Sequence, residues 1–332
     1  MGDGDIFRLT VALATADNPR NSESDVIQLR DGRLLLGWTE FYAGSSGDEG
    51  AARIVGRVSA DGGRTWGDKY TLVENDGQCN VMEVNFLRLR SGGIALLHCQ
   101  KNVEVGGTQT PDCRVMLRVS GDEGRTFGPA RQLTGENRYV ETASGRALRL
   151  EGGRSLVACD DMGSAFCLLS DDDGGNWREG QHVQPAEDGC WEPAAVELRD
   201  GRVLMFLRTE LGGQYQALSE DGGETWGEAV PSALSGTGAP VAIERIPTTG
   251  DLLAIWNHDV GSPRRRNPLT TAISRDEGQT WEHFRDIEMA ADNAFAYPSV
   301  TFVDKVALIT YFDYKGGMSL LLQGVPVGWF YE

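Results

Sequence analysis

Five segments of this chain share the pattern Ser-x-Asp-x-Gly-x-Thr-Trp with small variations, and they recur along most of its length. They begin at Ser59, Ser120, Ser170, Ser219 and Ser274, so that successive starts are 61, 50, 49 and 55 residues apart. The mean period is about 54 residues, and the 332 residues of the chain hold about six such units. Self-similarity at a period of this size is typical of propellers and other repeat architectures.

A second pattern keeps the same period and gives the same count of units. It consists of an apolar run, a tight turn that is often Asp-Gly or Gly-Gly, and a second apolar run, which is typical of a β-hairpin. Its copies begin at Leu29, Leu89, Leu150, Leu198, Ile246 and Phe302.

Together the two patterns predict one repeating unit: a hairpin, a third strand, the Asp-containing turn and a fourth strand. We expect the turn's carboxylate to accept backbone N–H bonds and its final Trp or Phe to pack between neighbouring sheets. A four-stranded antiparallel sheet cannot bury both faces alone, so six of them are expected to pack around an axis. The sequence therefore predicts an all-β fold, a single six-bladed β-propeller domain over residues 1–332. Turns then account for most of the 43 glycines.

Charge and apolar patterning exclude several classes of partner. The chain has 49 acidic and 31 Lys or Arg residues, a net charge of −18, which argues against nucleic acid or an anionic membrane as a partner. Its longest apolar stretches, such as 319–327, are too short to span a bilayer. Residues 1–10 lack the regions of a secretory signal, so we expect a cytoplasmic protein.

The six cysteines and four histidines show no metal-ligand spacing. We therefore expect no catalytic metal and no cofactor. The cysteines are expected to be reduced and mostly buried, although the sequence leaves a disulfide open, as it does the oligomeric state.

The five Asp-containing segments match the Asp-box, or BNR, repeat, and the chain resembles the sialidase (neuraminidase) family of six-bladed propellers over essentially its whole length. The box itself is structural, so function must come from other residues. The resemblance implies an exo-glycosidase that acts on a glycan or glycoconjugate and releases a terminal acidic sugar, sialic acid or a related nonulosonic acid. Such enzymes use a tyrosine nucleophile and are expected to retain the anomeric configuration.

The resemblance implies three catalytic residues. Tyr297, in the last unit, matches the family's late tyrosine nucleophile, and Glu192, in the fourth unit, matches the glutamate that activates it. An unperturbed phenol has a pKa near 10, so a neighbouring base is needed at neutral pH. Asp48 lies in a Gly- and Ser-rich loop of the first unit, where the family's acid that protonates the leaving oxygen is expected.

Arginines are expected to bind the carboxylate of the sugar, because the planar guanidinium matches it with two parallel hydrogen bonds. The resemblance implies this role for Arg208, at the end of the strand after Glu192, and for Arg266, the last of three consecutive arginines in the fifth unit. Glu40, at the end of the second strand of the first unit, matches a further active-site glutamate.

The chain departs from the family at the start of the first unit, where an Arg-Ile-Pro motif is expected. The sequence reads Asn-Ser-Glu-Ser from position 21, which places Ser22 or Glu23 where the arginine should be. A carboxylate at that position would repel an acidic substrate, unless Arg20 or Arg53 folds back to replace the missing cation.

This departure keeps two alternatives open. The first is a glycosidase or lyase that acts on a different sugar. The second is a propeller that binds carbohydrate or protein without turnover. The joint presence of an acid, a base and a phenol favours an enzyme, because binding alone does not need all three.

Overall fold

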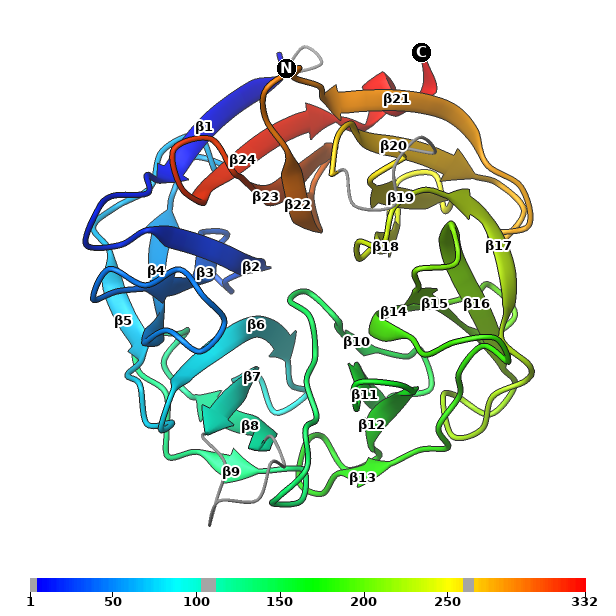
Figure 1. Cartoon of the computed structure of the whole chain (residues 1–332), viewed down its shortest axis with the longest axis horizontal. Helices are drawn as coiled ribbons and strands as arrows, with labels where there is room; N and C mark the ends of the chain where they lie inside the picture. Colours follow the sequence, from blue (N-terminus) through cyan, green and yellow to red (C-terminus); the bar gives the residue numbers. More distant parts are fainter. Residues whose placement is uncertain (1–4, 103–111, 259–265) are drawn as a thin grey trace.

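Six four-stranded antiparallel sheets are arranged around a central axis in the computed structural model (Figure 1). The structure describes residues 5–102, 112–258 and 266–332. The prediction of a six-bladed, all-β propeller is therefore confirmed. The hairpin pattern also gave the right pairing, since each predicted hairpin joins two neighbouring strands of one sheet.

Each sheet runs from an inner strand near the axis to an outer strand at the rim (Figure 1). The first three sheets, in chain order, consist of β2 (Arg20–Gln28), β3 (Leu34–Phe41), β4 (Ala52–Ser59) and β5 (Tyr70–Val73); β6 (Asn80–Arg88), β7 (Ile94–Asn102), β8 (Asp112–Ser120) and β9 (Arg131–Gln132); and β10 (Ala147–Arg149), β11 (Ser155–Asp160), β12 (Ala165–Ser170) and β13 (Arg178–Glu179).

The fourth and fifth sheets follow the same order. They consist of β14 (Trp191–Glu197), β15 (Val203–Arg208), β16 (Gly213–Ser219) and β17 (Val230–Ser235); and β18 (Ala242–Arg245), β19 (Leu252–Trp256), β20 (Leu269–Ser274) and β21 (Glu282–Glu288).

The sixth sheet joins the two ends of the chain. Its inner strands are β22 (Phe295–Val303), β23 (Val306–Asp313) and β24 (Ser319–Pro326), and its outer strand is β1 (Phe7–Ala12), which pairs antiparallel with β24. A short 3-10 helix, Val327–Tyr331, follows β24. The ring is thus closed by backbone hydrogen bonds between the first and last strands (Figure 1).

Every Asp-containing segment forms the same compact turn after the third strand of its sheet. In the first, Asp61 Oδ1 accepts hydrogen bonds from Ser59 Oγ at 2.8 Å and Thr65 N at 2.9 Å, while its Oδ2 accepts one from Thr65 Oγ1 at 2.6 Å. The carboxylates of Asp122, Asp172, Asp221 and Asp276 make the equivalent bonds. These bonds satisfy donors that a tight turn leaves without strand partners.

The aromatic residue that ends each turn packs between adjacent sheets. Trp66 is an example, because it packs against a cluster that contains Leu36 of the first sheet and Leu308 of the sixth. All six cysteines are buried and unpaired, as expected of small hydrophobic residues. Within the described residues, no helix is both long enough and apolar enough to cross a membrane.

The first turn yields a test of what these carboxylates contribute to stability. Replacing Asp61 with Ala removes three hydrogen bonds and should lower the free energy of unfolding by about 1–3 kcal/mol. Asp68 lies in the same loop, is exposed and makes no hydrogen bond within the described chain, so Asp68→Ala should change stability by less than about 0.5 kcal/mol. Urea unfolding at pH 7 measures both variants, and equal effects would contradict the structural role of the turn.

Candidate active site

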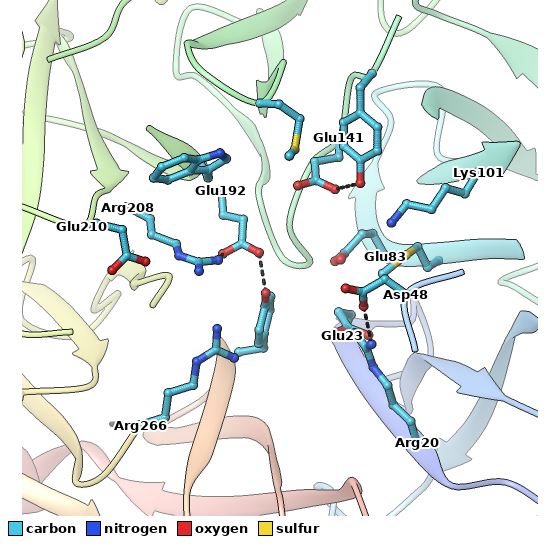
Figure 2. A pocket seen from close by; sticks show the side chains of 15 residues that line it. Arg20, Glu23, Asp48, Glu83, Lys101, Glu141, Glu192, Arg208, Glu210 and Arg266 are labelled. Carbon is cyan, nitrogen blue, oxygen red and sulfur yellow. Dashed lines mark hydrogen bonds and ion pairs between the residues drawn. The ribbon is translucent and has the colours of Figure 1, made fainter. Parts of the chain in front are cut away.

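A cavity of about 380 Å³ lies at one end of the propeller axis, and all six sheets or their connections contribute to its wall (Figure 2). Most of its lining is charged. The lining residues are Arg20, Glu23, Asp48, Met82, Glu83, Lys101, Tyr139, Glu141, Met162, Trp191, Glu192, Arg208, Glu210, Arg266 and Tyr297.

Four inner strands reach this cavity through the same backbone irregularity. The pairing registers of β2, β6, β14 and β22 each shift near the axis, and a non-glycine residue with positive φ lies at each shift. These residues are Glu23 (φ 41°), Glu83 (φ 65°), Glu192 (φ 43°) and Tyr297 (φ 54°), and all four line the cavity. A β-bulge re-aims a side chain at the expense of local backbone strain, and such features cluster at functional sites.

Tyr297, Glu192 and Arg208 form one hydrogen-bonded group. The Tyr297 hydroxyl donates to Glu192 Oε1 at 2.5 Å, and Arg208 Nη1 donates to Glu192 Oε2 at 2.5 Å. Glu192 and Arg208 lie on adjoining strands, with Trp191 directly opposite Arg208 in the pairing of β14 and β15. The sequence-predicted base and phenol, which are 105 residues apart, are thus in contact.

Burial raises the pKa of Tyr297 well above its ordinary value, and the Glu192 carboxylate adds to that effect, while Arg266 and Arg208 act to lower it. Tyr297 is therefore a neutral phenol that donates its proton toward Glu192. For Arg208, burial acts to lower the pKa, but Glu192, together with Tyr297 and Glu210, raises it above its ordinary value, so the guanidinium stays charged.

The backbone N–H of Glu192 is hydrogen-bonded to the carboxylate of a buried aspartate. Asp160 lies at the end of β11, where its Oδ2 accepts a hydrogen bond from Glu192 N at 2.8 Å and its Oδ1 accepts one from Met162 N at 3.1 Å. These bonds hold the positive-φ conformation that directs Glu192 toward Tyr297.

Arg266 lies beside the phenol rather than on a carboxylate. Its guanidinium carbon is 5.1 Å from the centroid of the Tyr297 ring, and its Nη1 donates to the Tyr314 hydroxyl at 2.7 Å. The Tyr297 ring also stacks on Phe312, with 5.5 Å between centroids. Arg264 and Arg265, the first two arginines of the run, lie outside the described residues.

Arg20 supplies the cation that is missing from the expected position in the first sheet, and it is one of the two arginines considered as a replacement. Arg20, the first residue of β2, is only 6% exposed and lines the cavity. Its Nη2 donates to Glu23 Oε1 at 2.5 Å, and its Nε donates to Ser22 Oγ at 2.7 Å. Arg20 precedes Ser22 and Glu23, the two residues expected at the arginine position, and a bulge between Ser22 and Ser24 interrupts the strand there.

Glu23 does line the cavity, but its carboxylate is neutralised by Arg20 instead of standing in place of an arginine. Three guanidinium groups therefore surround the cavity, from Arg20, Arg208 and Arg266 (Figure 2).

Asp48 lies on the loop between β3 and β4, and its carboxylate is bound to Arg20. Arg20 Nη1 donates to Asp48 Oδ1 at 2.5 Å, although the Asp48 side chain remains 66% exposed. The loop is attached to the second sheet by Asn80, whose Nδ2 donates to Asp48 O at 2.8 Å and to Gly50 O at 2.9 Å. Burial acts to raise the pKa of Asp48, but Arg20, with help from Lys101 and Arg266, holds it below its ordinary value.

Glu40 does not line the cavity, which corrects its expected place at the active site. Its side chain accepts two hydrogen bonds from Arg53, from Nη2 at 2.9 Å and from Nε at 3.0 Å, and pairs with Lys69. Arg53 on β4 is the cross-strand neighbour of Glu40, so the two side chains lie on the same face of the sheet and pair there.

Sequence reasoning missed a second group of lining residues, opposite Arg208 and Arg266. On this wall, Lys101 comes from β7 and Glu83 comes from β6 (Figure 2). Tyr139 and Glu141 come from the segment that leads into β10. The Tyr139 hydroxyl donates to Glu141 Oε2 at 2.7 Å, which repeats the phenol–carboxylate contact of Tyr297 and Glu192. None of these residues lies in a repeated motif, so the repeats in the sequence could not identify them as lining residues.

Comparison with known proteins agrees with this fold. The profile of the BNR repeat-like domain family matches residues 32–308. The sialidase of Micromonospora viridifaciens is 26% identical over 310 residues, which cover 82% of this chain and 47% of that protein. The anhydrosialidase of Macrobdella decora is 25% identical over 184 residues, which cover 49% of this chain and 24% of that protein. The chain thus spans about half or less of the length of these relatives.

Solved structures share the propeller at low sequence identity. The Hadza microbial sialidase Hz136 superposes with a TM-score of 0.81 at 18% identity, over 96% of this chain and 68% of that one. A protein of unknown function from Dyadobacter fermentans gives 0.79 at 17% identity, over 96% and 99% of the two chains. The Trypanosoma rangeli sialidase, in complex with 2,3-difluorosialic acid as a covalent intermediate, gives 0.76 at 16% identity, over 98% and 60%.

The family profile covers most of the described propeller, and relatives and solved structures of the same architecture include several sialidases. The chain therefore belongs to the BNR repeat-like family, with the six-bladed propeller fold of the sialidases.

Proposed function

We propose that this protein is a sialidase-type exo-glycoside hydrolase that releases a terminal acidic sugar with retention of configuration. The observation that carries the proposal is the hydrogen-bonded group of the Tyr297 phenol, the Glu192 carboxylate and the Arg208 guanidinium in the wall of the axial cavity. A phenol with its own base is suited to attack an anomeric carbon that bears a carboxylate, because a neutral nucleophile avoids charge repulsion.

In this mechanism the carboxylate of the sugar binds among Arg20, Arg208 and Arg266. Arg208 and Arg20 are already paired with Glu192 and Asp48, whereas Arg266 is bonded to the Tyr314 hydroxyl. Paired arginines remain able to bind a second carboxylate, since each guanidinium has five N–H donors. This arrangement would place the anomeric carbon beside Tyr297.

The first chemical step forms a bond between Tyr297 Oη and the anomeric carbon and breaks the glycosidic bond. Glu192 accepts the phenol proton, and Asp48 donates a proton to the leaving oxygen. In the second step water attacks the anomeric carbon, its proton passes to Asp48, and Tyr297 recovers its proton from Glu192. Two inversions at the same carbon give net retention.

The ion pair with Arg20 determines when Asp48 can act as an acid. In the ligand-free protein Asp48 is ionised, because Arg20 holds its pKa below the ordinary value despite its partial burial. A substrate carboxylate on Arg20 would compete with Asp48 for the guanidinium. Loss of that partner raises the pKa of Asp48, so that substrate binding itself would favour the protonated acid.

The nucleophile can be tested with a matched pair of tyrosines. Tyr297→Phe should lower kcat on a fluorogenic α-linked sialoside about 1,000-fold or more, since the covalent step is lost. Tyr311→Phe is the control: its hydroxyl also donates to a carboxylate, Glu288 at 2.5 Å, but it lies outside the cavity and should leave kcat within about twofold. Mass spectrometry after reaction with a 2,3-difluoro sialosyl fluoride should locate the sugar on Tyr297.

Other outcomes of the activity assay would favour one of the two alternative functions, an enzyme with a different reaction or sugar, or a propeller that only binds. An unsaturated or anhydro product would indicate a lyase-type reaction at the same site, and turnover limited to other sugars would change the substrate assignment. Binding of sialosides without any turnover by the unmodified protein would show a carbohydrate-binding propeller and contradict the proposed activity.

The pairing of Asp48 predicts different pH profiles for kcat/KM and kcat. Asp48 must be protonated to act, and its pKa in the free protein lies below the ordinary 3.8, so kcat/KM should begin to fall with rising pH below about pH 4. In the substrate complex the pKa is higher, and kcat should fall only at a higher pH. Steady-state kinetics from pH 3 to 8 measure both profiles, and coincident alkaline limbs would rule out the exchange at Arg20.

A further inference from the structure

Lys101 is a largely buried cation that lines the cavity and has no oxygen partner among the described residues. It lies on β7, opposite Asn80 on β6 and Cys113 on β8, and is 5% exposed. Its ammonium is 5.3 Å from the centroid of the Tyr139 ring. Across residues 5–102, 112–258 and 266–332, no hydrogen-bond acceptor contacts Lys101 Nζ and no carboxylate lies within 4.0 Å of it.

The other cations that line the cavity differ in this respect. Arg20 binds Glu23 and Asp48, Arg208 binds Glu192, and Arg266 binds the Tyr314 hydroxyl. Lys101 therefore keeps its N–H donors available to a ligand that enters the cavity. The Lys101 side chain extends toward the interior of the cavity, where a ligand oxygen could accept a hydrogen bond from its ammonium (Figure 2).

Glu141 is the matching acceptor on the same wall. Its Oε2 accepts the hydrogen bond of Tyr139, while its Oε1 accepts none within the described chain. Burial acts to lower the pKa of Lys101, but Glu141 exerts the strongest opposing effect among the carboxylates, and the net shift is upward. The two charges therefore act on each other without being in contact, which leaves room for a bridging group.

We propose that Lys101 and Glu141 form a hydroxyl-binding pair that holds a vicinal diol of the bound sugar, at the end remote from its carboxylate. The proposal rests on the function proposed above, because it assumes that the carboxylate occupies the arginines on the opposite wall. One hydroxyl would accept a hydrogen bond from Lys101, and its neighbour would donate one to Glu141.

The charges around Lys101 favour a diol over a second anionic group. Glu83, Glu141 and Asp48 line the same side of the cavity (Figure 2). Burial raises the pKa of Glu83 well above its ordinary value, so the repulsion that an anion would meet there comes from Asp48 and Glu141. A hydroxyl, in contrast, both donates and accepts. A neutral polyol thus satisfies the ammonium and the free carboxylate oxygen together.

Binding of two non-hydrolysable ligands tests the pair. The first is the 2,3-dehydro derivative of N-acetylneuraminic acid, and the second is the same compound after periodate oxidation and borohydride reduction, which removes two carbons and the diol of the exocyclic chain. The unmodified protein should bind the shortened ligand about 10- to 100-fold more weakly, as expected for the loss of hydrogen bonds to charged groups. In Lys101→Met the two dissociation constants should agree within about threefold.

Two further variants support the comparison. Glu141→Gln keeps an oxygen for Tyr139 but changes the charge of the pair, and it should also lose most of the preference for the longer ligand. Lys69→Met is the control, because Lys69 pairs with Glu40 outside the cavity, and it should keep the preference of the unmodified protein.

Isothermal titration calorimetry gives all these constants at about pH 7.5, which lies above the pKa of Glu141 that burial raises to about 6. An unchanged preference in both Lys101→Met and Glu141→Gln would overturn the proposal, as would a failure of the unmodified protein to bind either ligand. Diol-dependent binding without hydrolysis of sialosides would support the pair but contradict the proposed catalytic activity.

Discussion

Closure of the ring is the constraint on which the rest of this structure depends. The outer strand of the sixth sheet, β1, pairs with β24 through contacts such as Phe7 with Gly324 and Leu9 with Leu322, which are more than 300 residues apart in the chain. The cavity takes side chains from every sheet or its connections, so its full lining exists only once the ring is complete. Loop-closure entropy makes such distant pairing slow, and assembly of the cavity is expected to be a late event in folding.

Within the closed ring, β-bulges in four inner strands direct side chains near the axis into the cavity. Regular β-strands would alternate their side chains between the two faces of each blade. The positive-φ residues Glu23, Glu83, Glu192 and Tyr297 break that alternation at the axis and line the cavity. Hydrogen bonds fix the strained conformations: Glu192 N donates to Asp160 Oδ2, and Glu83 N donates to Thr39 Oγ1.

The sequence was sufficient to predict the fold because the repeat is long, regular and tied to turn chemistry. The period gave six units, and the Ser-x-Asp turns and hairpins gave the strand order within each sheet. The resemblance gave Tyr297, Glu192, Arg208, Arg266 and Asp48, all of which line one cavity.

Prediction failed where the backbone departs from regular strands or where no motif recurs. Arg20 lies two residues before Ser22, the first position expected for the arginine, and the strand there contains a bulge at Glu23 that side-chain patterns do not reveal. Glu40 was assigned by position, whereas its orientation is set by its cross-strand neighbour Arg53. Lys101 and Glu141 are single charged residues, and only the three-dimensional arrangement shows that they face the same space.

The pairing of arginines with carboxylates inside the cavity also affects how a charged ligand approaches it. Because Arg20 and Arg208 are largely neutralised by Glu23, Asp48 and Glu192, they project little positive potential into the solvent. At long range an anion meets mainly the field of a body with a net charge of −18. Capture then proceeds against electrostatic repulsion, so added salt should speed association by screening the body while leaving the short-range contacts in place.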